Sequence, residues 1–273
     1  MIGVELVKLA RRPRTWLTLL LLNALPTTVA ILLAVTDIAP QPGSGPAFLS
    51  AVLANGELFS VAALAIVLPL FLPIAVAVVA GDSIAGEAQS GTLRYLIARP
   101  VGRTRLLVAK LVVVLVFTVV AVLLVAGIGY VVGTLVLGTQ PQTAASSLVT
   151  VSGSPLTPGQ LVLRVALAMA FVALSMLGVA AMALMLSTFT DSPLAATLGA
   201  MAFLIGSSLL LTLDAAQSLQ PYLPTRYWLS FVDLFRDPIL WRNVERGALL
   251  QLVYVAVFLT VAWANFMTKD VKS

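Results

Sequence analysis

The chain has 273 residues, of which 60% are hydrophobic and only 10% are charged, with a formal net charge of +5 and a mean hydropathy of +1.06. This balance is that of an integral membrane protein and not of a soluble domain. Because the sequence contains neither Cys nor His, it excludes disulfides, thiolate and imidazole metal sites, and catalysis by Ser-His or Cys-His pairs.

The N-terminal segment, residues 1–14, alternates apolar and charged side chains. This pattern predicts an amphipathic helix that lies along the membrane surface before the chain turns into the bilayer. A cationic flank that only fixes the topology is the alternative. Pro13 predicts a break in the helix before the first membrane span.

Six long apolar runs follow. A helix needs about 20 apolar residues to cross a hydrocarbon core about 30 Å thick, and each run reaches roughly this length. The sequence therefore predicts an all-α integral membrane protein with a single transmembrane domain over residues 1–273. The expected spans are residues 16–36, 58–80, 106–137, 161–189, 193–213 and 248–267.

Two spans contain residues that alter helix geometry or packing. Pro69 and Pro73 lie four residues apart in the second span and remove two backbone donors from one face of the helix. They predict either a hinge or a static bend that neighbouring helices tolerate. Gly129 and Gly133 form a GxxxG pair in the third span, which permits the close approach of another helix, including one from a second subunit.

Positive charge is distributed unevenly between the loops. Lys and Arg cluster in the N-terminal segment, in the loop after the second span and in the C-terminal tail, whereas residues 37–57 and 139–160 contain none. Because Lys and Arg accumulate in cytoplasmic loops, we expect both termini in the cytoplasm. The twelve Arg and four Lys, with abundant Ala and Val, indicate a GC-rich bacterial genome and hence the bacterial plasma membrane. The net charge follows from this asymmetry and indicates no nucleic-acid partner.

The loop after the second span, residues 81–105, carries the most specific pattern. Gly81 and Gly86 have the G-x-x-x-x-G spacing of a phosphate-binding loop, but Glu87 stands where such a loop has Lys, and a carboxylate there repels phosphate. We therefore expect no ATP site in this chain. Residues 84–96 predict a helix with acids near its N-terminus, which suits the helix dipole, and Pro100 follows its end.

The order of residues in this loop is Asp82, Ile84-Ala85-Gly86-Glu87, Gly91-Thr92-Leu93-Arg94, Pro100-Val101, Arg103 and Lys110. This order resembles the signature of permease subunits of the type-2 ABC exporter family. The resemblance implies that the loop contains a cytoplasmic coupling helix, which sits in a groove of a separate ATP-binding subunit. The residues expected at that contact are Asp82, Ile84, Gly86, Glu87, Gly91, Thr92, Leu93 and Arg94.

Residues 214–245, before the last span, are rich in aromatic side chains interleaved with Pro, Arg and Asp. Rings with polar tips favour the membrane interface, so we expect short re-entrant or interfacial helices on the external side. The resemblance implies that such helices lie near the exit of a transport path, and an interfacial anchor is the alternative. The residues singled out are Tyr222, Tyr227, Trp228, Phe231 and Phe235.

The resemblance also implies the function. The chain is expected to be a non-catalytic permease that exports a substrate across the plasma membrane, with no cofactor of its own and with ATP and Mg²⁺ bound in the partner subunit. Six spans supply half of the usual transmembrane unit, so a homodimer is favoured, with a related second permease as the alternative. Membrane lipid is the remaining expected partner.

Other functions fit the same sequence. An ABC-like permease complex that serves cofactor maturation, signalling or scaffolding would carry every motif named above. An ATP-independent channel or carrier is less favoured, because it needs no helix for a cytoplasmic partner. The spans also lack the buried acids on which ion-coupled carriers depend.

Overall fold

The computed structural model describes residues 2–36, 56–92, 102–138 and 157–268. Within these ranges the chain is an all-α membrane protein in which six helices are long and apolar enough to cross a membrane. The predicted fold class is confirmed. The six helices are α2 (Pro13–Thr36), α5 (Phe71–Gln89), α7 (Arg103–Val132) with its π-helical extension η2 (Gly133–Leu137), α8 (Pro158–Phe189), α9 (Pro193–Leu210) and α10 (Trp241–Thr268).

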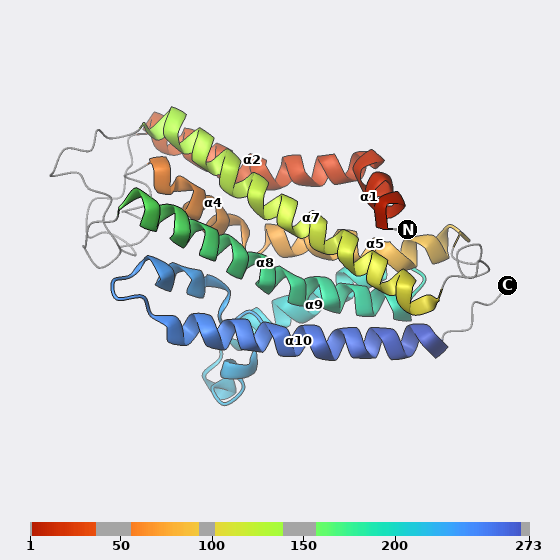
Figure 1. Cartoon of the computed structure of the whole chain (residues 1–273). Coiled ribbons are helices and arrows are strands. Elements are labelled where there is room, and N and C mark those ends of the chain that lie inside the picture. The colour runs from red at the N-terminus through yellow and green to blue at the C-terminus, as the bar shows by residue number, and fades with distance from the viewer. Residues whose placement is uncertain (1, 37–55, 93–101, 139–156, 269–273) are drawn as a thin grey trace.

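Helix α8 lies at the centre of the bundle and packs against α5, α7, α9 and α10 (Figure 1). Every residue from Gly178 to Leu184 is buried. Several of these residues are Gly or Ala, and such small residues let membrane helices approach closely. Helix α1 (Ile2–Arg11) and the C-terminal end of α10 lie at the same end of the bundle as the C-terminal end of α5.

The second predicted span, residues 58–80, is divided in the structure. The short helices η1 (Gly56–Leu58) and α4 (Phe59–Val67) come first, and α5 begins only at Phe71. Leu70 has a φ of −139° and a ψ of −56°, outside the helical region. Pro69 lies inside this break, whereas Pro73 lies in the first turn of α5, where a helix N–H has no intrahelical acceptor. Both a hinge and a static bend require such a break, and the choice between them stays open.

Helix α5 also extends further than predicted. It runs without interruption to Gln89, so residues 84–89 continue a membrane-spanning helix and do not begin a separate one. The expectation of a distinct helix starting at residue 84 is therefore wrong. Residues 93–96 of that expected helix lie outside the described residues.

The GxxxG pair, with Gly129 in α7 and Gly133 at the start of η2, packs inside the chain. A Cβ atom added to Gly129 would lie 2.8 Å from the Cβ of Ala63 on α4, and one added to Gly133 would overlap the carbonyl oxygen of Gly56. The two glycines therefore let α7 approach α4 and η1 closely, as this motif does between membrane helices.

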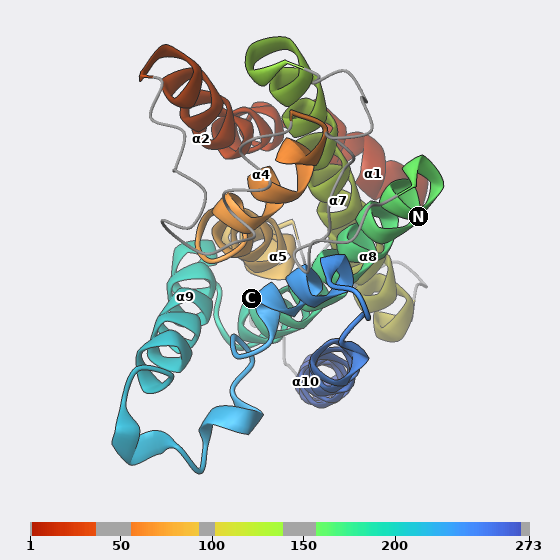
Figure 2. The ribbon, with the colours of Figure 1, turned by 90° about the vertical axis from the view of Figure 1, so that its left-hand side faces the viewer.

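The segment before α10 forms three short 3₁₀ helices: η3 (Asp214–Ala216), η4 (Gln220–Tyr222) and η5 (Trp228–Phe235). Helix α9 diverges from the bundle toward its C-terminal end, and η3 and η4 project from the side of the molecule (Figure 2). Helix η5 returns to pack against α8 and α10.

Candidate functional site

The polar face of α1 is turned toward the bundle. Glu5, Lys8 and Arg12 are spaced by three and four residues, so they lie on one side of the helix and of the turn that follows it. On the other side Val4 and Val7 are exposed, Val4 to 71%. The predicted amphipathic helix is present; Val4 and Val7 point away from the protein, whereas Leu9 packs against the core.

Four charged side chains meet where α1, α5 and α7 come together. The Nζ atom of Lys110 on α7 lies 2.6 Å from Glu5 Oε2 and is also ion-paired with Glu87 Oε1. The Nζ atom of Lys8 lies 2.6 Å from the same oxygen of Glu87. We call Glu5, Lys8, Glu87 and Lys110 the ionic cluster; its two acids and two bases balance in charge.

The ionic cluster is mostly inaccessible to solvent. Glu87 is 2% exposed and Lys110 is 3% exposed. Taking such groups out of water costs several kcal/mol per ion. Their ion-pair partners offset this cost and so keep the two side chains charged in the folded protein. The Oε2 atom of Glu87 has no hydrogen-bond partner among the described residues, so the cluster leaves one buried acceptor unsatisfied.

A second ion pair lies beside the cluster. Arg12 pairs with Asp82 on α5, one helical turn before Gly86. A Cβ atom on Gly86 would overlap the carboxylate of Asp82. Gly86 therefore leaves the space in which Asp82 turns toward Arg12.

Helix α8 holds the same part of α5 from the opposite side. The hydroxyl of Ser187 donates to the carbonyl oxygen of Gly81 at 2.7 Å and accepts from the N–H of Ala85 at 2.8 Å. In a regular helix these two groups of α5 bond to each other. Ser187 is fully buried and thereby fixes α5 against α8 one turn before the ionic cluster.

The C-terminal end of α5 is a compact exposed turn. Gly91 has a φ of +69° and its N–H donates to Ala88 O at 3.0 Å, an arrangement in which a residue with positive φ ends a helix. The hydroxyls of Ser90 and Thr92 each donate to the carbonyl oxygen of Glu87 at 3.3 Å. We call the exposed residues 89–92 the α5 turn.

The predicted coupling residues fall into three groups. Asp82 and Glu87 form ion pairs with α1 and the turn that follows it, and Gly86 leaves the space for the Asp82 carboxylate. Ile84 is buried and packs with Leu106 of α7, Leu184 of α8 and Phe266 of α10. Gly91 and Thr92 form the α5 turn, and Leu93 and Arg94 lie outside the described residues.

Sequence reasoning did not find the internal partners of Glu87. It placed Glu5 and Lys8 in the predicted amphipathic helix and Lys110 at the end of the signature after the second span, and it did not single out Ser187. The sequence offered one signal, which is that these few charges stand in a largely apolar chain. A charge that such a chain buries needs a partner of opposite sign. Which charges pair depends on the arrangement of α1, α5 and α7.

The external aromatic residues occupy two environments. Trp228, Phe231 and Phe235 are buried in the main core, whereas Tyr222 is 68% exposed and Tyr227 is half-buried. Their role in a transport path stays a prediction.

Side-chain hydrogen bonds tie this external segment to the bundle. Gln251 Nε2 on α10 donates to the carbonyl oxygen of Pro224 at 2.7 Å, and the hydroxyl of Tyr254 donates to the carbonyl oxygen of Tyr222 at 2.7 Å. The segment is thus attached to α10 at two points.

The family model described as "Protein of unknown function (DUF2705)" matches residues 30–272. The chain belongs to this family. The DUF2705 match begins inside α2, so it contains Asp82, Glu87, Lys110 and Ser187 and follows α1 in sequence. A search of curated proteins finds no match to the chain. Within the described part of this DUF2705 protein, no group of three or more potential metal-ligating side chains is placed to hold a metal ion.

Proposed function

We propose that this chain is the membrane-spanning subunit of an ATP-driven ABC transporter that exports a substrate across the bacterial plasma membrane. The observation that carries the proposal is the position of the α5 turn. This turn is exposed, and it begins two residues after Glu87, whose carboxylate is ion-paired with both α1 and α7. A separate ATP-binding subunit that moves the turn would therefore act on three helices at once.

The contacts around the C-terminal part of α5 favour its movement together with α1, α7 and α8. Separating α5 from α7 would break the buried Lys110–Glu87 ion pair and leave Glu87 with Lys8 and Lys110 with Glu5 as their remaining partners, and breaking a buried ion pair is costly. Ser187 adds a link to α8. In this proposal the break at residues 68–70, at the other end of α5, is the hinge at which α5 changes its angle to α4.

This arrangement changes the role proposed for Glu87. The resemblance implies direct contact with the ATP-binding subunit, but a 2% exposed carboxylate that pairs with two lysines has little surface to offer. We assign the direct contact to the α5 turn and to Leu93 and Arg94, which follow it in sequence. Glu87 then acts as a positioning residue that connects the turn to α1 and α7.

The cytoplasmic side is assigned to the end of the bundle that carries α1 and the α5 turn. Lys8, Arg12, Arg103 and Lys110 all lie at this end, and Lys and Arg accumulate on the cytoplasmic side. Both termini are then cytoplasmic. ATP and Mg²⁺ belong to the partner subunit, and a second copy of the chain completes the transmembrane unit, with a related permease as the alternative.

A permease-like complex without export is the second candidate, because the ionic cluster and the α5 turn would serve any task driven by an ATP-binding subunit. A substrate transport assay separates these two functions. A channel or carrier independent of ATP predicts no partner at the α5 turn.

Site-specific photo-crosslinking in the native host tests the proposed contact. A crosslinking residue at Gln89 in the α5 turn should yield an adduct with a protein that carries an ATP-binding sequence signature. The matched control is Val35, which is 78% exposed. It lies near the C-terminal end of α2, at the end of the bundle opposite to the α5 turn (Figure 1). Absence of an ATPase adduct at Gln89, or equal adducts at both positions, would count against the proposal.

A further inference from the structure

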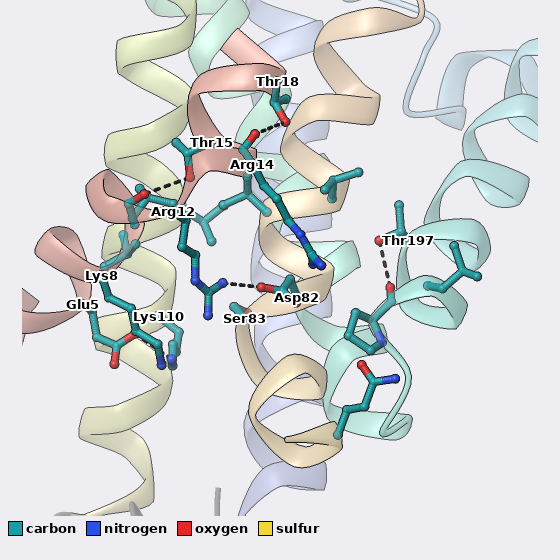
Figure 3. A pocket seen from close by; sticks show the side chains of 18 of the residues that line it. Glu5, Lys8, Arg12, Arg14, Thr15, Thr18, Asp82, Ser83, Lys110 and Thr197 are labelled. Atoms are coloured by element: carbon teal, nitrogen blue, oxygen red, sulfur yellow. Dashed lines mark hydrogen bonds and ion pairs between the residues drawn. The ribbon is translucent and has the colours of Figure 1, made fainter. Parts of the chain in front are cut away.

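A cavity of about 360 Å³ lies beside the ionic cluster, between α1 and α2 on one side and α9 on the other (Figure 3). Its floor is formed by α5 and α7. Arg12 and Arg14 line one part of the wall, and the apolar side chains of Val79, Val114 and Leu194 line another. The cavity thus combines cationic and apolar surfaces.

The cations of the cavity are not fully compensated. Lys8 and Lys110 are balanced by Glu5 and Glu87, and Arg12 is balanced by Asp82. The guanidinium of Arg14 has no hydrogen-bond or ion-pair partner among the described residues, and its side chain extends into the space between α5 and α9 (Figure 3). One positive charge therefore remains for a ligand.

The cavity is accessible from the surface that faces the lipid. Arg14 and Leu194, from its two sides, are both exposed. The helices that flank it also present apolar side chains outward, including Leu17 and Leu20 on α2 and Leu198 on α9. These residues are typical of a lipid-facing surface, so the bilayer borders the opening.

We propose that this cavity binds the phosphodiester headgroup of an anionic phospholipid, with Arg14 as the main contact to the phosphate. A guanidinium forms paired, charge-assisted hydrogen bonds with phosphate oxygens. The acyl chains extend from the opening along the apolar surfaces of α2 and α9. A zwitterionic lipid is bound less well, because the positive charge of its headgroup meets the surplus cation. This site does not depend on ATP coupling.

Native mass spectrometry of the purified full-length chain tests the proposal. The chain is released from nanodiscs that contain equal amounts of phosphatidylglycerol and phosphatidylcholine, and the retained lipids are counted. We expect retention of phosphatidylglycerol and a loss of about tenfold in its affinity in Arg14→Gln, the scale of one charge-assisted hydrogen bond. Unchanged retention in Arg14→Gln would overturn the proposal.

The matched control is Arg11→Gln, which removes the same charge from the same flank at an exposed position outside the cavity lining. It should retain phosphatidylglycerol like the unmodified chain. Equal losses in both variants would show that general surface charge, and not the cavity, attracts the lipid, and this would also overturn the proposal. Melting temperatures of both variants verify that the fold is intact.

Competition distinguishes a lipid headgroup from free phosphate. Inorganic phosphate is added at constant ionic strength to the chain loaded with phosphatidylglycerol. Retention of the lipid supports recognition of headgroup and acyl chains together. Displacement by millimolar phosphate would assign the cavity to free phosphate and would contradict a lipid site.

Discussion

Lys110 on α7 is ion-paired with Glu87 on α5, and the two side chains are almost completely buried. Lys8 on α1 contacts the same oxygen of Glu87. Glu87, expected from the sequence at a surface contact with a partner subunit, is therefore buried and connects three helices. In the proposed mechanism, this relationship passes a displacement of the end of α5 on to α1 and α7.

Substitutions of Glu87 and Lys110 in the ionic cluster should have non-additive effects on the free energy of unfolding. Glu87→Gln should lower the free energy of unfolding by about 3–5 kcal/mol, because Lys8 and the buried Lys110 are then left with Glu5 as their one countercharge in the cluster. Adding Lys110→Met removes the stranded charge and should recover part of the loss. Thermal unfolding in detergent measures both effects, with the exposed Glu245→Gln as the control. Strictly additive losses in the double variant would argue against a coupled pair.

Gly91 should be required for the backbone conformation of the α5 turn. Gly91→Ala places a Cβ at a φ of +69° and should cost about 1–2 kcal/mol. Gly102→Ala is the matched control in the same loop, since its φ is −57° and no atom lies within 4 Å of its added Cβ. Equal melting temperatures for the two variants would contradict this account of the turn.

The contact between α7 and α4 should tolerate no added side chain at Gly129. Gly129→Ala places a methyl group 2.8 Å from Ala63 Cβ and should destabilise the fold by about 1–3 kcal/mol through overpacking. Gly127→Ala on the same helix meets nothing within 4 Å and should leave stability unchanged or raise it. Thermal melting of both variants measures the difference, and a harmless Gly129→Ala would show that α7 does not pack here as described.

The external segment should loosen when its attachment to α10 is removed. Gln251→Leu leaves the carbonyl oxygen of Pro224 without its donor, at a cost of about 1–3 kcal/mol. Hydrogen exchange of residues 214–235 should then become faster. Thr260→Val is the control, because its hydroxyl bonds only to Ala256 O within α10. Unchanged exchange in Gln251→Leu would show that this hydrogen bond does not hold the segment.

The sequence predicts the number and class of the helices well, because a membrane span requires a long apolar run whatever its neighbours are. It also locates the perturbation at Pro69, since a missing N–H affects the helix locally. The direction in which Glu87 points is a different kind of property. It depends on Lys8 and Lys110, which are 79 and 23 residues away from Glu87 in the chain.

The sequence alone also did not predict that Gly91 ends α5. A glycine after a polar helix fits both a partner contact and a helix end, and only its positive φ identifies the second role. Ser187 carried no motif at all. Its hydroxyl gains its role from the position of α8 beside α5, which a single sequence does not specify.

The most direct measurement is quantitative mass spectrometry of the proteins that copurify with the tagged full-length chain, extracted from its native host in a mild detergent. The account predicts a stoichiometric ATP-binding subunit that is lost from Thr92→Arg in the exposed α5 turn and retained by Gly127→Ala. Clean recovery of the chain without any ATP-binding subunit, in a detergent that preserves a known membrane complex of the same host, would contradict the proposed coupling to ATP.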